Sequence, residues 1–155
     1  MKYLKYFNVN ESISDIISYD KFLTITEMDD IPETKDFYNN TIKLFESLPD
    51  PLKVYRFIMV DDINDIRLDE IGTSWTWSTE NWDDLINSVI YDDEVKSGDI
   101  IIKFEAEIDK KYISWKETMN KYITQCLYHD IEESEIVILP KSYKYLKKLK
   151  WEEYD

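Results

Sequence analysis

The segment Pro49-Asp50-Pro51 separates two parts of the sequence that differ in hydrophobic periodicity. Before it, residues 1–50 carry apolar side chains at roughly helical spacing, with Ser12 and Asp15 as a candidate helix cap and Pro32 opening a further stretch. After it, β-branched and aromatic residues follow one another without a helix cap. Helices first and strands later are typical of the α+β class, so we expect an α+β fold.

The part that follows Pro51 predicts four strands and two helices. The predicted strands are Leu52–Val60, Gly72–Ser78, Ile100–Ile108 and Glu133–Leu139. An amphipathic helix is expected after the second strand, with Trp82, Leu85, Ile86, Val89 and Ile90 on one side. Ser114 and Glu117 predict a capping box for a short helix after the third strand. No repeat or linker divides the 155 residues, so we expect one domain over residues 1–155.

The distribution of charge restricts the partners of the chain. The formal net charge is -14, and a field of that sign repels phosphate backbones, so nucleic acid is an unfavourable partner. Residues 141–155 are different, because five lysines oppose three acidic residues there and leave -16 for residues 1–140. We interpret this Lys-rich C-terminal segment as a solvent-exposed lysine face.

Single copies of two residue types exclude several kinds of site. Cys126 is the only cysteine and His129 the only histidine, so neither an intramolecular disulfide nor a Cys/His zinc site can form, and we expect no metal. Nowhere do about 18 apolar residues run together, so we expect no membrane partner and a cytoplasmic location.

Two strands place polar side chains where chemistry can use them. Arg56 shares a strand face with Val54 and Ile58, where a guanidinium is costly without an anion. That anion is either an acidic side chain of the protein or a ligand. Ser74 and Thr76 share a face of the next strand, so their hydroxyls either orient a carboxylate or face water.

A third strand carries two carboxylates. Glu133 and Glu135 are two residues apart, so both project to one face, followed there by apolar Val137 and Leu139. Such a pair at the mouth of a pocket can act on two different atoms at once, although an acidic pair in so acidic a chain is also common at the surface.

In this order, the three strands resemble the arginine-serine-glutamate class of ADP-ribosyltransferases, a family that includes bacterial toxins and phage-encoded enzymes. The resemblance covers residues 52–140 and rests on Tyr55-Arg56, on Gly72-Thr73-Ser74-Trp75-Thr76, and on Glu133-Ser134-Glu135-Ile136-Val137-Ile138-Leu139-Pro140. Two departures from the family pattern are Ser74-Trp75-Thr76 in place of Ser-Thr-Ser, and the lack of a glycine after Arg56.

The resemblance implies a fold and an activity. It implies a core of two antiparallel or mixed sheets around an NAD-binding cleft, with residues 1–50 as a helical N-terminal part. It implies a mono-ADP-ribosyltransferase that uses NAD as substrate and modifies a host protein, with arginine as the acceptor residue. Arg56, Ser74 and Glu135 are then expected on neighbouring strands, with side chains close enough to share one ligand.

The resemblance also implies a role for each site residue. Arg56 contacts the phosphates and ribose of NAD, and Glu135 faces the ribose cation that forms when nicotinamide leaves. Ser74 holds Glu135 by a hydrogen bond, with Thr76 as the alternative, and Glu133 serves the acceptor. Tyr55, Trp75 and Thr76 complete the expected NAD contacts. The loop Thr124–Glu132, with Tyr128 and His129, corresponds to the target-recognising loop.

Two other functions fit the same sequence. A small, very acidic protein can imitate the phosphates of DNA and inhibit a defence nuclease. A transferase-like chain can also lose its activity and keep only the binding of a partner.

Overall fold

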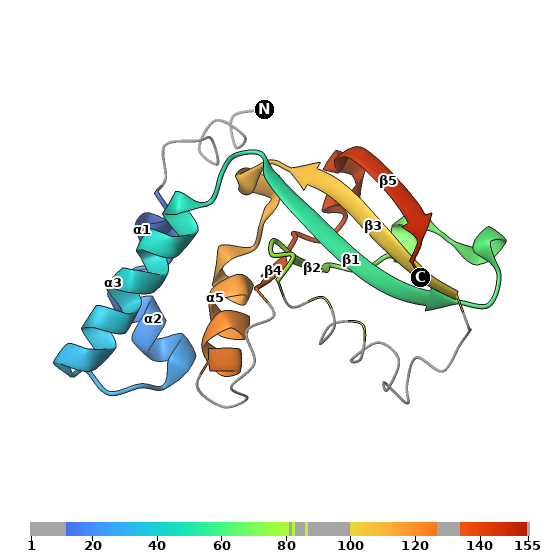
Figure 1. Ribbon diagram of the computed structural model, residues 1–155. Helices are drawn as coiled ribbons and strands as arrows, with labels where there is room; N and C mark the ends of the chain where they lie inside the picture. The colour runs from blue at the N-terminus through green and yellow to red at the C-terminus, as the bar shows by residue number, and fades with distance from the viewer. Residues whose placement is uncertain (1–11, 81, 83–85, 87–99, 127–133, 155) are drawn as a thin grey trace.

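The computed structural model, described for residues 12–80, 82, 86, 100–126 and 134–154, places a group of helices beside one antiparallel sheet (Figure 1). The helices are α1 (Ile13–Ile16), α2 (Tyr19–Thr26), α3 (Pro32–Ser47) and α5 (Trp115–Thr124). The strands are β1 (Leu52–Val60), β2 (Ser74–Thr76), β3 (Ile100–Ile108), β4 (Glu135–Val137) and β5 (Lys147–Glu153). Single-turn helices are η1 (Ile63–Asp65), η2 (Leu68–Glu70), η4 (Lys110–Tyr112) and η6 (Ser142–Tyr145). The predicted α+β class is confirmed.

The N-terminal helices begin where the sequence supplies caps. Ser12 and Asp15 form a capping box at α1, and the Ser18 hydroxyl accepts from the Lys21 N–H at the start of α2. Pro32 stands in the first turn of α3, where its missing N–H costs nothing. The Tyr38 hydroxyl on α3 donates to the Ile17 carbonyl at 2.7 Å, which joins α3 to the segment between α1 and α2.

Lys110 attaches the end of α3 to the sheet side of the molecule. Its ammonium Nζ lies 2.8 Å from the carbonyl oxygens of Phe45 and Leu48, at the C-terminal end of the helix. A cation is favoured at a helix C-terminus by the helix dipole, and burial lowers the pKa of Lys110. One side chain therefore caps α3 and positions it against η4.

The five described strands form one sheet in the order β4-β2-β1-β3-β5, with every neighbouring pair antiparallel. β1 and β3 pair over their whole length, from Leu52 opposite Ile108 to Val60 opposite Ile100. Their predicted bounds are confirmed. The resemblance implied two sheets, but the described strands belong to one.

β2 and β4 are shorter than predicted, with three residues each. Tyr55 opposite Thr76 is the one register pair that joins β1 and β2 in the described residues. Beside it, the Ser74 carbonyl accepts a hydrogen bond from the Arg56 guanidinium. A side chain of β1 thus supplies a hydrogen-bond donor to β2 beside the register pair.

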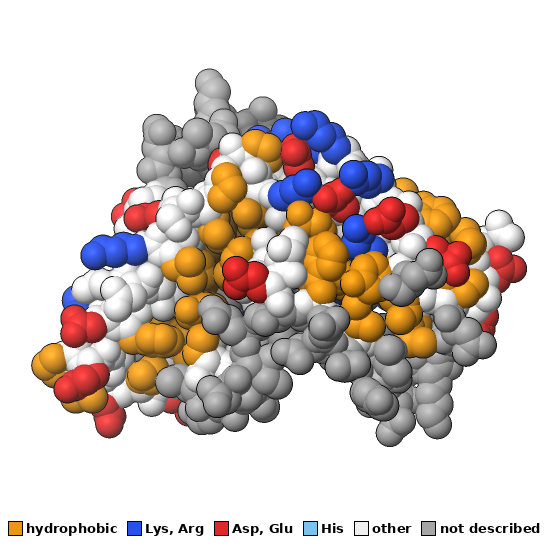
Figure 2. All heavy atoms as spheres, viewed as in Figure 1, with side chains coloured by type: hydrophobic (Ala, Val, Ile, Leu, Met, Phe, Trp, Pro, Cys, Tyr) orange, Lys and Arg blue, Asp and Glu red, His pale blue; other side chains and the backbone are white. Residues whose placement is uncertain are grey.

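The five lysines of the Lys-rich C-terminal segment are exposed, as expected, but its second half forms a strand, β5, that was not predicted. Lys150 lies 2.7 Å from Glu105, and Lys147 lies 2.9 Å from Asp109. Acidic residues at alternate positions of β3 thus face lysines of β5. Figure 2 shows the two charges interleaved over this part of the sheet.

The start of α5 differs from its prediction. Ser114 precedes α5, but its side chain makes no capping hydrogen bond, so the predicted capping box is wrong. Instead the backbone N–H of Ser114 donates to the Val137 carbonyl at 2.7 Å, so β4 fixes the start of α5. The predicted amphipathic helix from Trp82 to Ile90 lies largely outside the described residues.

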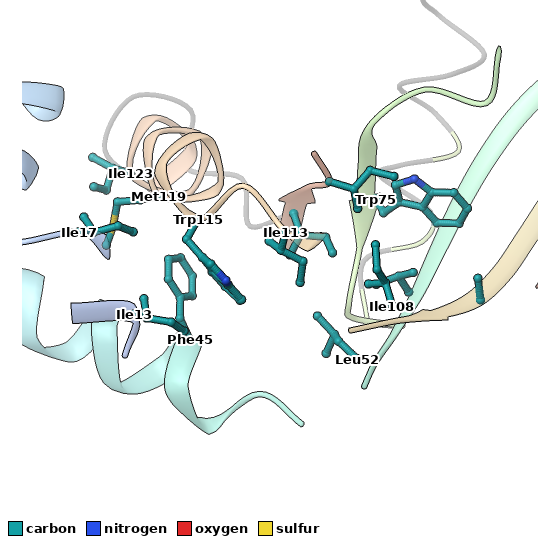
Figure 3. Packing of buried hydrophobic residues seen from close by; sticks show 14 of the residues in the cluster. Ile13, Ile17, Phe45, Leu52, Trp75, Ile108, Ile113, Trp115, Met119 and Ile123 are labelled. Carbon is teal, nitrogen blue, oxygen red and sulfur yellow. The ribbon is translucent and has the colours of Figure 1, made fainter. Parts of the chain in front are cut away.

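The core continues from the helices into the sheet (Figure 3). On the helical side Phe45 packs against Trp115 with ring centroids 5.2 Å apart, and α5 lies between α3 and the sheet. Labelled members on the helical side are Ile13, Ile17, Phe45, Trp115, Met119 and Ile123; those on the sheet side are Leu52, Trp75, Ile108 and Ile113. This continuity joins the helical part and the strands around one core.

Candidate functional site

The three strands that carry the predicted site residues are neighbours in the sheet. β2 lies between β1 and β4, so the strands of Arg56, Ser74 and Glu135 are adjacent although about 80 residues separate the first from the last. The expectation of neighbouring strands is confirmed. Register then decides which side chains can meet.

The three side chains do not share one face of the sheet. Tyr55 pairs with Thr76, and Thr76 pairs with Glu135, so these residues project on one side. Arg56 projects on the opposite side with its β3 partner Phe104, against which the Trp75 ring packs at 6.5 Å. The register therefore places the Arg56 side chain on the face opposite to Ser74 and Glu135, although the charge of Glu135 still acts on the guanidinium.

The register instead forms a row of three side chains across the sheet, which we call the Tyr55-Thr76-Glu135 row. Tyr55 is 8% exposed and Thr76 is 4% exposed, while the Glu135 side chain is 14% exposed. Opposite residues of an antiparallel pair have Cβ atoms about 5 Å apart, so hydroxyl and carboxylate are within reach of each other. The row combines an aromatic ring, a hydroxyl and a half-buried carboxylate.

Thr76, and not Ser74, is the residue opposite Glu135. Ser74 pairs with Val137, one position further along β4 on the same face. From the sequence either hydroxyl could orient the carboxylate, and Ser74 is expected because it comes first after Gly72. The register favours Thr76.

The Arg56 guanidinium is largely buried and contacts the backbone of β2. Its Nη1 donates to the Ser74 carbonyl, and its Nε is buried without a hydrogen-bond partner among the described residues. Burial lowers the pKa of Arg56, and the negative charge of Glu135 acts in the opposite direction. A buried guanidinium N–H without an acceptor is costly, so this side chain can accept an anion.

Gly72 makes room for the guanidinium. A Cβ on Gly72 would lie 2.9 Å from Nη2 of Arg56, and the backbone φ of 93° is one that side chains other than glycine rarely adopt. Gly72 and Thr73 are exposed. The surface nearest to the Arg56 guanidinium is thus a stretch of backbone with no side chain over it at Gly72.

Trp75 and Tyr55 differ in their access to a ligand. The Trp75 indole is 2% exposed and its Nε1 donates to the Gly72 carbonyl at 3.4 Å. Trp75 was expected among the NAD contacts, but its indole ring is buried in the core and is not available to a ligand. Tyr55 lies on the opposite face, where its ring meets Trp82 at 5.2 Å.

Glu135 has two contacts from α5 that the sequence did not predict. Gln125 donates from Nε2 to Oε2 of Glu135 at 2.9 Å, and Nζ of Lys121 lies 3.7 Å from Oε1. The sequence predicts a helix before the acidic pair, and this was the only sign of such contacts. The spacing does not tell which helix residues lie against Glu135.

Several predicted residues lie outside the described part of the chain. Glu133, Tyr128 and His129 are among them, and so is most of the loop Thr124–Glu132. Their expected roles stay predictions.

A separate groove of about 860 Å³ lies where the helices meet the sheet. Its walls include Ile13 of α1, Pro51, Trp115 of α5 and Leu139. None of the predicted site residues lines it. Figure 2 shows hydrophobic side chains gathered between the helical part and the sheet.

Comparison of the chain with protein-family models, with curated proteins and with solved structures found no match. Among the described residues, no helix combines the length and the apolar character that crossing a membrane requires.

Proposed function

We propose that the protein is a mono-ADP-ribosyltransferase that uses NAD as substrate and modifies a host protein. The observation that supports this most is the Tyr55-Thr76-Glu135 row, in which an aromatic ring and a hydroxyl stand beside a half-buried carboxylate. A preorganised carboxylate in a partly dry site stabilises a developing cation far better than one in water. Cleavage of the bond between nicotinamide and ribose creates such a cation.

In the proposed reaction, the two glutamates have different roles. The bonding electrons of the ribose–nicotinamide bond leave with nicotinamide, and Glu135 stabilises the resulting oxocarbenium-like ribose. A nitrogen of the acceptor arginine then forms the new bond to the ribose carbon, and its proton passes to Glu133. Thr76 orients Glu135 in this proposal, with Ser74 as the neighbour on the same strand face.

Arg56 binds the phosphates of NAD in the proposal. Its buried Nε is without a partner in the described residues, and a guanidinium is the preferred donor for phosphate oxygens. In the proposal the ligand approaches at Gly72, which is exposed and has no side chain between solvent and the guanidinium.

Parallel measurement of nicotinamide release and target labelling tests the proposal. The purified protein is incubated with NAD labelled in its ADP-ribose part and with a cell lysate. We expect labelled protein with wild type, loss of both activities in Glu135→Gln, and loss of labelling with residual NAD hydrolysis in Glu133→Gln, because water needs less positioning than a guanidinium. Equal loss of both activities in the two variants would refute the division of roles, and no labelling by wild type would refute transfer.

A further inference from the structure

Helix α5 holds the carboxylate of Glu135 from the side away from β2. Gln125, directly after the last residue of α5, donates Nε2–H to Oε2 at 2.9 Å, while Lys121 stands 3.7 Å from Oε1. Each carboxylate oxygen thus faces a different side chain of the same helical segment.

The two contacts differ in strength. A hydrogen bond to an ionised carboxylate is roughly twice as strong as one between neutral groups. The Lys121 side chain is 52% exposed, so solvent screens its charge and the pair contributes little. Gln125 is half-buried, as is Glu135, and therefore supplies the main restraint on the carboxylate.

The position of Gln125 is itself fixed by the fold. Thr118, on the same side of α5, accepts the Val137 backbone N–H at 3.0 Å, and the Ser114 N–H donates to the Val137 carbonyl. These contacts attach α5 along β4, the strand of Glu135. The hydrogen bond from Gln125 therefore joins two segments whose relative position is already set, which limits the loss of side-chain entropy.

We infer that Gln125 is a positioning residue for Glu135, which holds Oε2 and so fixes the orientation of the carboxylate toward the electron-poor ribose. The inference rests on the proposed function. In this inference Gln125 touches no reacting atom and acts on the reaction through Glu135. Thr76 stands opposite Glu135 on β2, and Gln125 restrains the carboxylate from the end of α5.

The test compares steady-state NAD hydrolysis by wild type and Gln125→Met, which removes the donor and keeps the length of the side chain. We expect kcat to fall on the order of 10-fold with KM within about twofold, since a misplaced catalytic group affects the chemical step. Gln125→Glu keeps the size and polarity but also lacks the donor, and we expect at least the same loss. Lys116→Met, an exposed change on the same helix away from Glu135, is the matched control and should keep the wild-type rate.

A double-mutant cycle separates positioning from a merely structural role. If Gln125 acts through Glu135, adding Gln125→Met to Glu135→Gln lowers the residual rate no further. The same fold-loss in both backgrounds, or an unchanged kcat in Gln125→Met, overturns this inference and leaves the proposed function intact. Absence of nicotinamide release by the wild type overturns the proposed function and this inference with it.

Discussion

Thr76 and Ser74 show how one residue of register decides a role. Both hydroxyls lie on the same face of β2, and from the sequence either could orient Glu135. The antiparallel pairing places Thr76 opposite Glu135 and Ser74 opposite Val137. Strand periodicity predicted the shared face correctly, but register depends on the pairing of distant segments, which local patterns do not contain.

We expect Thr76→Val to lower kcat for NAD hydrolysis by about 10-fold or more, because it removes the hydroxyl beside Glu135 while keeping the shape of the buried side chain. Ser74→Ala is the matched change one register position away and should cost less than about threefold. Rate assays on the two variants compare the roles directly. A larger loss in Ser74→Ala would return the orienting role to Ser74.

Arg56 was predicted to need an anion, and the structure gives its guanidinium a backbone carbonyl and a buried Nε without a partner in the described residues. Arg56→Lys should weaken NAD binding on the order of 10-fold, since an ammonium keeps the charge but loses the planar fork. Titration calorimetry measures the dissociation constant of NAD for each variant. Arg67→Lys alters the other arginine, which is exposed, and should bind like wild type. Equal affinities of Arg56→Lys and wild type would remove Arg56 from the site.

At the scale of elements, β1 and β3 were predictable because β-branched and aromatic residues fill them without interruption. β5 was not, because five of its seven residues from Lys147 to Glu153 are exposed lysine or acid, and Trp151 is exposed as well. β5 is a strand because it pairs with β3. Glu105 of β3 binds both Lys150 of β5 and Lys53 of β1, a cross-strand arrangement that appears only when the three strands are side by side.

The Glu105 pairs predict a pH dependence of stability. Hydrogen bonds from Lys150 and Lys53 hold the pKa of Glu105 below its ordinary value of 4.5. The folded-state pKa is thus depressed, so the stabilisation is complete above pH 4.5 and is lost as the pH falls through the folded value. Urea unfolding should show wild type more stable than Glu105→Gln by about 1 kcal/mol near neutral pH, with the difference shrinking as the pH falls below 4.5. A difference that is constant over this range would show that the ion pairs do not stabilise the sheet.

For the whole molecule, the question is whether charge or a few placed groups carry the function. The segment from Asp61 to Glu70 contains five exposed acidic residues and one arginine, which is the kind of surface that a DNA mimic would use. In contrast, the acidic residues of β3 are paired with lysines. Lysines therefore neutralise the acidic residues along β3 and β5, whereas the segment from Asp61 to Glu70 keeps a net negative charge.

Replacing Asp61, Asp62, Asp65 and Asp69 by asparagine separates the two functions. An enzyme that relies on the Tyr55-Thr76-Glu135 row should keep its rate of NAD turnover within about twofold, because charges beyond a Debye length of about 8 Å are screened. The rate of nicotinamide release and the inhibition of a DNA-cutting nuclease are measured on the same preparation. Loss of nuclease inhibition in the variant, with no NAD turnover in either protein, would favour the mimic.

The most direct test of the account is nicotinamide release from NAD by wild type and Glu135→Gln, each first shown to be folded by a cooperative thermal transition. Glutamine keeps the size of the side chain and can keep a hydrogen bond to Gln125, so the variant removes mainly the negative charge. The account predicts measurable release by wild type and a loss of about 10² or more in the variant, as expected for removal of one preorganised electrostatic group. Equal release by the two proteins, or none by wild type, would contradict it.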